Sequence, residues 1–170
     1  MAPALILGPL LRHVGPSDAT VWVETDTSCE VEVRIEGTSY SSRTFTVEGH
    51  HYALVLIADL ETGSFYEYAV ALDGERVWPE EGDPFPLPVI RTIAPDDKLT
   101  LAFGSCRVSV PHEPPYTLSR GTIKRGGMSG HRYERDALHA LALRMKRRPH
   151  EEWPDALLLL GDQVYADEVS

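Results

Sequence analysis

The chain has 170 residues, of which 42% are hydrophobic and 25% are charged, a composition that excludes disordered and fibrous proteins. Its formal net charge of −10 disfavours a protein that follows nucleic-acid phosphates, because such binding needs a basic surface. The longest apolar runs fall far short of the ~20 residues that a membrane-spanning helix needs, so we predict no membrane span.

The beginning of the chain lacks the features of an export signal. Residues 1–15 are mildly apolar, but they contain no basic segment and no small-residue cleavage site before the first strand-like pattern. We therefore expect a cytoplasmic protein. The two cysteines, Cys29 and Cys106, are too few for a disulfide scaffold, and we expect two free thiols rather than one bridge.

Up to about Thr92 the pattern is that of β-strands. Val31, Val33 and Ile35 alternate with charged residues, which is the period of two of a strand with one wet face. Similar short runs, separated by turn residues, occur at residues 10–14, 19–25, 43–47, 51–60, 65–72, 76–79 and 89–92. Many short strands with no convincing helix predict a β-sandwich over residues 1–95.

One segment of this region refines the fold class. Residues 60–70, Leu-Glu-Thr-Gly-Ser-Phe-Tyr-Glu-Tyr-Ala-Val, resemble the tyrosine corner of immunoglobulin-like and fibronectin type III domains. In that feature a tyrosine at the start of a strand bonds its hydroxyl to backbone just upstream, and Tyr66 holds this position. The alternative is an ordinary aromatic strand residue. The corner favours an immunoglobulin- or fibronectin-III-like sandwich.

A change of pattern follows. Five prolines between residues 79 and 95, and the charged Asp-Asp-Lys after them, predict a domain joint near residues 93–98. Beyond the joint the sequence predicts a strand at residues 99–103, a helix at 133–148 that Pro149 ends, and a continuously apolar strand at 155–160. This order is a βαβ unit, so residues 96–170 are expected to begin an α/β domain. Two parallel strands and one helix leave sheet faces and edges uncovered, and we expect a domain truncated at Ser170.

Chemically distinctive residues follow both of these strands. Cys106 comes after the first strand and Asp162 after the second, and a right-handed crossover makes such strands neighbours. Tyr165 lies three residues beyond Asp162, on the same side of a turn. A thiolate, a carboxylate and a phenolate form an anionic cluster that suits a strongly Lewis-acidic ion. Taken alone, Gly161-Asp162 also fits a structural cap or turn.

Other candidate groups also have structural explanations. Arg107 is a candidate for binding phosphate oxygens, and a structural salt bridge explains it as well. The basic residues between Arg120 and Arg135 lie among glycines, and they either face an anionic substrate or form a solvated loop. The seven histidines fall in no recognisable ligand spacing, and no Gly-x-Ser-x-Gly elbow surrounds Ser105.

The two motifs, Phe-Gly-Ser-Cys-Arg at residues 103–107 and Leu-Gly-Asp-Gln-Val-Tyr at 160–165, resemble those of the alkaline phosphatase D (PhoD-like) family of metallophosphoesterases. The resemblance covers nearly the whole chain, since that family carries an immunoglobulin- or fibronectin-like domain before its catalytic fold. It implies that Cys106 and Tyr165 bind a ferric ion and that Asp162 bridges to a second metal, commonly calcium.

The chain departs from this family in several places. The residue after Gly-Asp is Gln163, where an aromatic residue is usual, and the segment 108–130 is unusually long. The family's Gly-Asn-His/Asp/Glu motif and its later His and Asp ligands would lie beyond Ser170. The resemblance therefore implies that this chain supplies only part of the metal site.

The activity implied is hydrolysis of phosphate mono- or diesters by the complete protein. In such enzymes two metal ions ~3.5–4 Å apart activate a hydroxide for attack on phosphorus, and no protein nucleophile is needed. We expect this chain to be inactive by itself. Two other hypotheses stay open: a non-catalytic binding module built on the sandwich, and a degenerate phosphatase-like protein whose metal site has decayed.

Overall fold

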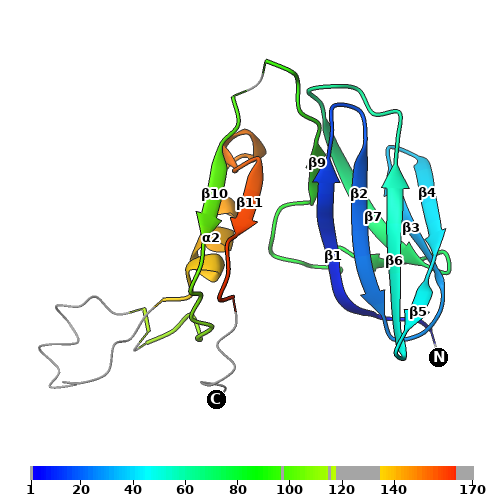
Figure 1. Cartoon of the computed structure of the whole chain (residues 1–170), viewed down its shortest axis with the longest axis horizontal. Coiled ribbons are helices and arrows are strands. Elements are labelled where there is room, and N and C mark those ends of the chain that lie inside the picture. Colours follow the sequence, from blue (N-terminus) through cyan, green and yellow to red (C-terminus); the bar gives the residue numbers. More distant parts are fainter. Residues whose placement is uncertain (1, 97, 115, 118–134, 164–170) are drawn as a thin grey trace, which may run out of the picture. The chain divides into compact units, whose positions relative to one another are not determined.

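The structure, a computed structural model, describes residues 2–96, 98–114, 116–117 and 135–163. The chain divides into two compact units, Met1–Lys98 and Leu99–Ser170 (Figure 1). Within the described ranges, no helix combines the length and the apolar character that crossing a membrane requires. Both cysteines are free thiols, as the sequence predicts, with Cys29 buried and Cys106 exposed.

The first unit is a β-sandwich of two antiparallel sheets (Figure 1). One sheet has the order β1-β2-β6-β5, with strands β1 (Leu5–Val14), β2 (Ala19–Thr25), β5 (Phe45–Val47) and β6 (His50–Ile57). The other has the order β4-β3-β7-β8, with β9 also paired to β7, and comprises β3 (Glu30–Ile35), β4 (Thr38–Arg43), β7 (Phe65–Leu72), β8 (Glu75–Trp78) and β9 (Val89–Arg91). The predicted sandwich is confirmed.

The core lies between the two sheets and comes from alternating residues of each strand. Val21 and Val23 of β2 are fully buried, as are Val31 and Val33 of β3. β-branched side chains suit these positions because they pack well on a pleated surface. Burying a side chain of this size contributes about 1.5–3 kcal/mol before the entropy of ordering is counted. Both sheets therefore share one core.

Tyr66 forms the tyrosine corner that the sequence predicts. Its hydroxyl oxygen accepts a hydrogen bond from the backbone N–H of Glu61, with an N–O distance of 2.7 Å. The fully buried Thr92 closes the same corner, because its hydroxyl donates to the Glu61 carbonyl at 2.6 Å and accepts from the Ser64 N–H at 2.9 Å. Two side-chain hydroxyls thus fix the turn that leads into β7.

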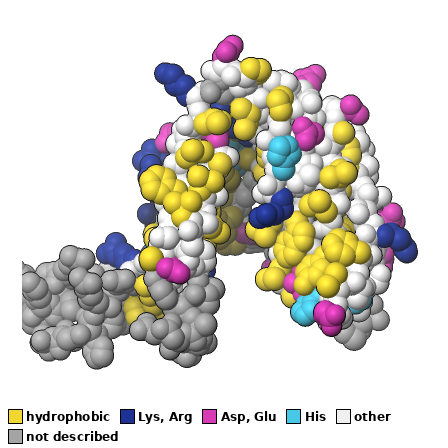
Figure 2. Space-filling model, in the orientation of Figure 1, with side chains coloured by type: hydrophobic (Ala, Val, Ile, Leu, Met, Phe, Trp, Pro, Cys, Tyr) yellow, Lys and Arg dark blue, Asp and Glu magenta, His cyan; other side chains and the backbone are white. Residues whose placement is uncertain are grey.

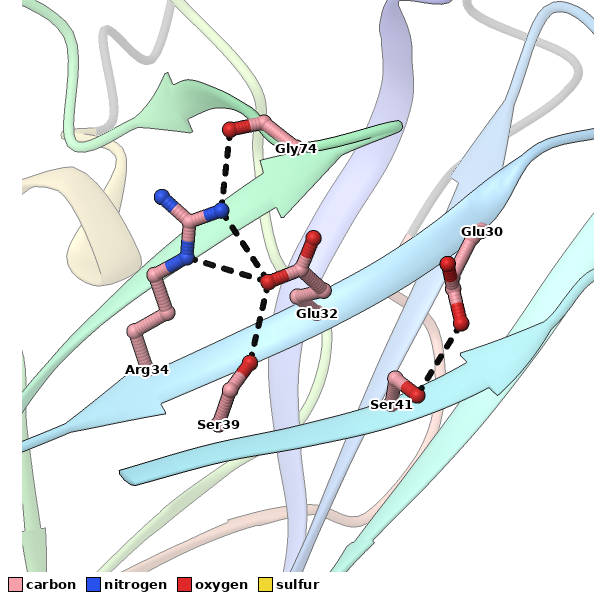
Figure 3. A network of polar contacts seen from close by, with 6 residues as sticks. All are labelled: Glu30, Glu32, Arg34, Ser39, Ser41 and Gly74. Carbon is pink, nitrogen blue, oxygen red and sulfur yellow. Dashed lines mark hydrogen bonds and ion pairs between the residues drawn. The ribbon is translucent and has the colours of Figure 1, made fainter. Parts of the chain in front are cut away.

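The outer face of the β4-β3-β7-β8 sheet carries a polar network (Figure 3). Glu32 Oε2 accepts hydrogen bonds from Arg34 Nε at 3.1 Å, Arg34 Nη2 at 3.0 Å and Ser39 Oγ at 2.9 Å. Arg34 also donates to the Gly74 carbonyl at 2.8 Å. The hydrogen bonds from Ser39 and Arg34 hold the pKa of the Glu32 carboxyl below its ordinary value. The polar side chains make this outer face suited to exposure to water.

Some strand boundaries differ from the sequence-based prediction. Strand β4 is missing from that prediction because its sequence, Thr-Ser-Tyr-Ser-Ser-Arg, is polar and lacks alternation; it lies at a sheet edge, where little of it is buried. Strand β1 begins at Leu5 rather than at residue 10 and passes through Gly8-Pro9, with register shifts against β2 on either side. Proline fits there because β1 is also an edge strand.

The second unit contains the predicted strand-helix-strand order. Strands β10 (Leu101–Gly104) and β11 (Ala156–Leu159) pair in parallel, and between them come the helix α2 (Ala137–Met145) and the 3-10 turn η1 (His150–Glu152). Helix α2 is shorter than the predicted 133–148: Asp136 caps its N-terminus by accepting from the Leu138 and His139 N–H groups, and residues 146–148 form a turn. The first two residues of the predicted helix lie outside the described ranges.

Both strands of this unit present apolar side chains to solvent. Phe103 of β10 is 73% exposed, and Leu160 at the end of β11 is 64% exposed. A continuous apolar run is typical of a parallel strand covered on both faces. The sequence of β11 therefore has the character of a buried strand, whereas its surroundings within the described residues leave it open.

Candidate functional site

The candidate site lies where β10 and β11 end. Their parallel register pairs Gly104 with Leu159, so both carboxyl ends meet at one edge of the sheet. Backbone hydrogen bonds continue past the strands: the Cys106 N–H donates to the Gly161 carbonyl at 3.3 Å, and the Arg107 N–H donates to the Asp162 carbonyl at 2.8 Å. The two loops that carry the predicted ligands are therefore joined to each other.

These loops bring Cys106 and Asp162 together. The Cys106 Sγ lies 3.5 Å from Asp162 Oδ2, within hydrogen-bond range for a thiol, and both residues are exposed. Ligands bound at ~2.3 Å (sulfur) and ~2.1 Å (oxygen) to one transition-metal ion stand about 3.1–3.6 Å apart, for bond angles between ~90° and ~110°. The observed separation therefore fits a thiolate and a carboxylate that share one ion.

The backbone at both residues is in the left-handed region, with φ of +55° at Cys106 and +46° at Asp162. Aspartate tolerates this region because its short polar side chain can bond locally, whereas cysteine has no such compensation. Such conformations cost about 1–3 kcal/mol each and cluster at functional sites. The strained backbone turns the thiol and the carboxylate toward each other at the edge of the sheet.

The third predicted ligand, Tyr165, lies outside the described residues. Of the three candidates the structure thus places two, and it places them side by side. In the part of the chain that the structure describes, no group of three or more His, Cys, Asp and Glu side chains is arranged to hold a metal ion. Gln163 donates its side-chain amide to the Gly161 carbonyl.

Arg107 is held in a bidentate ion pair. Its Nε lies 3.1 Å from Asp136 Oδ1 and its Nη2 lies 2.7 Å from Asp136 Oδ2. Asp136 is 4% exposed and at the same time caps helix α2. The Arg107 guanidinium holds the pKa of the Asp136 carboxyl below its ordinary range, and the same bond raises the pKa of Arg107. The structural salt bridge is therefore present, and contact with phosphate oxygens stays a prediction.

A cavity of about 340 Å³ opens between the two strands and helix α2. Its walls combine apolar side chains with the site residues, and they include Leu138, Leu141, Leu157, Cys106, Arg107 and Gln163. Mostly apolar walls with a few convergent polar groups are typical of small-molecule sites. Cys106 and Arg107 are both among the residues that line this concave space.

Sequence reasoning missed two features of the second unit. Asp136 was not a candidate, although an aspartate directly before an apolar helical pattern is a recognised N-cap signal. The rings of His112 and His139 lie 4.7 Å apart between centroids, one in the loop after β10 and the other on α2. Because these histidines are far apart in the sequence, no spacing pattern predicts their contact.

Comparison with known proteins identifies a family for the first unit. The family model described as "Domain of unknown function (DUF7800)" matches residues 2–90, which extends from the start of the sandwich into β9. No curated protein and no solved structure matches the chain. The family match spans 89 of the 170 residues, more than half of the chain. The chain therefore belongs to the DUF7800 family.

Proposed function

We propose that this chain is the N-terminal part of a metal-dependent phosphatase or phosphodiesterase of the PhoD-like type. The observation that carries the proposal is the 3.5 Å separation of Cys106 Sγ and Asp162 Oδ2 at the joined carboxyl ends of two parallel strands. The pairing of a soft sulfur ligand with a hard carboxylate on strained loops has no evident role in packing, because both side chains are exposed. It is suited to holding a metal ion.

In this proposal Cys106, Asp162 and Tyr165 are ligands. The thiolate and the phenolate would hold a ferric ion, and the carboxylate would help to hold it together with a second ion, which is divalent and which we propose is calcium. Such a pair of ions supplies an activated hydroxide and neutralises charge that develops on the phosphoryl oxygens. Each ligand side chain must lose its proton to bind, and a cation close by favours this loss.

The neighbouring residues have supporting roles. Asp136 holds the Arg107 guanidinium beside the Cys106 loop, where its positive charge would favour an approaching phosphate ester. The cavity between the strands and α2 gives space for the non-reacting part of a substrate. These residues would bind and orient the substrate, and the proposed reaction needs no protein nucleophile.

The exposed apolar strands support a larger α/β metallophosphoesterase fold. Side chains such as Phe103 and Leu160 are more than half exposed. Water-exposed apolar strands of a parallel sheet are normally covered by helices or extended by further strands. We propose that additional structure covers them and supplies the remaining ligands, so that this chain alone has no appreciable turnover.

A second function class has its own support. The family match lies on the sandwich, and the described residues contain no three-ligand cluster of His, Cys, Asp and Glu. A non-catalytic binding module, or a phosphatase-like protein whose metal site has decayed, would have these properties. Both alternatives predict a chain without specific iron binding.

Iron binding by the 170-residue chain tests the proposal. Fe(III) is titrated into the purified protein, and the visible phenolate-to-iron charge-transfer band and the bound stoichiometry are measured. We expect Tyr165→Phe to abolish the band, and Asp162→Asn and Cys106→Ser to weaken binding. Tyr40→Phe, which changes a tyrosine of the sandwich, is the matched control and should leave the band unchanged.

Two outcomes would contradict the proposal. Iron binding that is equal in the parent chain and in all three ligand variants would show that the ligands are misassigned. Absence of specific binding would favour the binding module or the degenerate protein. Hydrolysis of p-nitrophenyl phosphate and bis-p-nitrophenyl phosphate is measured in parallel with iron and calcium added, and robust turnover by this chain would show that the site is complete within it.

A further inference from the structure

The outer face of the β1-β2-β6-β5 sheet is apolar. Since the valines of β2 and β6 point into the core, Trp22 of β2 and Tyr52, Leu54 and Leu56 of β6 point outward. Residues paired across antiparallel strands share a face, and the register adds three more side chains. We call this set the apolar sheet face; its members are Leu7, Leu10, Trp22, Phe45, Tyr52, Leu54 and Leu56.

Figure 2 shows hydrophobic side chains gathered over these strands. Leu56 is 67% exposed, Leu7 55% and Phe45 54%. The aromatic members support each other: the ring centroids of Trp22 and Tyr52 lie 5.7 Å apart, and those of Phe45 and Tyr52 lie 5.9 Å apart. The face is therefore an ordered apolar surface, enriched in the aromatic residues that mark interface centres.

The other outer face of the same sandwich provides an internal comparison. There Glu32, Arg34 and Ser39 form a hydrogen-bonded polar network (Figure 3). The fold therefore does not require an apolar exterior, since one of its two sheets has a polar one. A contiguous apolar patch on one face only is typical of an interaction surface.

Charge indicates what covers this surface. Glu24 lies on the same face, but its side chain is 9% exposed and its Oε1 lies 2.6 Å from His50 Nδ1. The carboxylate is therefore covered and paired with His50, whose ring is exposed on the same face, and the rest of the face presents mainly apolar side chains within a chain whose formal net charge is −10. A two-fold interface places the same patch on both sides, so it requires a surface that does not repel itself. A mainly apolar patch on an acidic chain meets this requirement, and a strongly charged partner would find little that is complementary.

The area is of the right order for a dimer. Five of the seven side chains are between 42% and 67% exposed, and Trp22 and Tyr52 are half-buried. With ~150 Å² or more for each free side chain, the face contributes on the order of 500 Å² a side. The polar rim of such a patch brings this near the ~800 Å² a side of a standard interface. Two antiparallel sheets can stack face to face about 10 Å apart, as in a sandwich core. We infer that two copies of this chain pair through the apolar sheet face, independently of the proposed metal site.

The oligomeric state of the 170-residue chain tests this inference. Sedimentation velocity over a wide concentration range should show a monomer–dimer equilibrium. Leu54→Lys places a charge at the centre of the face and should weaken dimerisation by more than about tenfold, the effect of disrupting an interface centre. Ser41→Lys adds the same charge to the exposed polar face of the other sheet, and it should leave the dimer unchanged.

Two further variants separate the possible interfaces. Leu56→Lys changes the most exposed leucine of the face and gives a second test if Leu54→Lys fails to fold, which circular dichroism would reveal. Leu158→Lys lies on the exposed strand β11 of the other unit, and we expect it to leave dimerisation intact. A chain that stays monomeric at every concentration overturns the inference. So does a dimer that Leu158→Lys abolishes while Leu54→Lys and Leu56→Lys leave it unchanged.

Discussion

Tyr66→Phe measures how much the tyrosine corner stabilises the sandwich. The substitution removes a hydroxyl that accepts the Glu61 N–H at 2.7 Å, in a side chain that is 9% exposed. The bond is part-buried, and an amide N–H that loses its partner in such a place costs about 1–3 kcal/mol. The sandwich has about 95 ordered residues, and a domain of this size shifts its melting temperature by about 4–8 °C per kcal/mol. We expect a loss of about 2 kcal/mol and a melting temperature roughly 8–16 °C lower.

The matched control is Tyr40→Phe. The Tyr40 hydroxyl donates to the Ala58 carbonyl at 2.9 Å in a solvent-exposed bond, so water can replace it and the loss should stay below about 1 kcal/mol. Urea unfolding followed by far-ultraviolet circular dichroism gives both free energies, with unchanged m-values as evidence that the folded state is intact. If Tyr66→Phe costs no more than Tyr40→Phe, the corner does not stabilise the fold in the way argued.

Three other predictions follow from the structure. Asp136→Asn should increase hydrogen exchange in α2 at neutral pH by an amount equivalent to about 1–3 kcal/mol. The pKa of Asp136 is lowered in the folded state, so this difference between parent and variant is present above the unfolded pKa near ~3.9 and disappears as the pH falls below it. Ile57→Ala, at a core position that is 1% exposed, should cost about 2–5 kcal/mol in urea unfolding, whereas Leu56→Ala next to it should change stability by less than about 0.5 kcal/mol. Limited proteolysis should cut first within residues 93–98, between the two units, and first cuts inside Phe65–Leu72 would contradict this.

The fold was predictable from sequence wherever one strand face is buried. The bounds of β2 and β7 agree with the prediction, because a half-buried strand alternates and turn residues flank it. Strand β4 was not predictable in this way, since its position is set by hydrogen bonds to β3 and its side chains bury little area. The local pattern of apolar and polar residues indicates burial, but it does not indicate backbone pairing at a sheet edge.

The candidate site shows the same division. The meeting of Cys106 and Asp162 follows from topology, because parallel strands bring their carboxyl ends together whatever lies between them. The Arg107–Asp136 pair joins residues 29 positions apart across a segment without a regular pattern, so nothing local predicts it. The left-handed backbone conformation of Cys106 could not be foreseen either, since cysteine rarely adopts it.

The two backbone hydrogen bonds between the loops have a consequence for any ion that binds there. They hold the Cys106 and Asp162 main chains at a fixed spacing before a ligand arrives, so the conformational entropy of bringing the two side chains together is lost during folding. An ion that binds one of them finds the other at a high effective concentration. The affinity for such an ion should therefore depend on intact β10–β11 pairing. Loosening either strand should weaken the binding of the ion by both side chains at once.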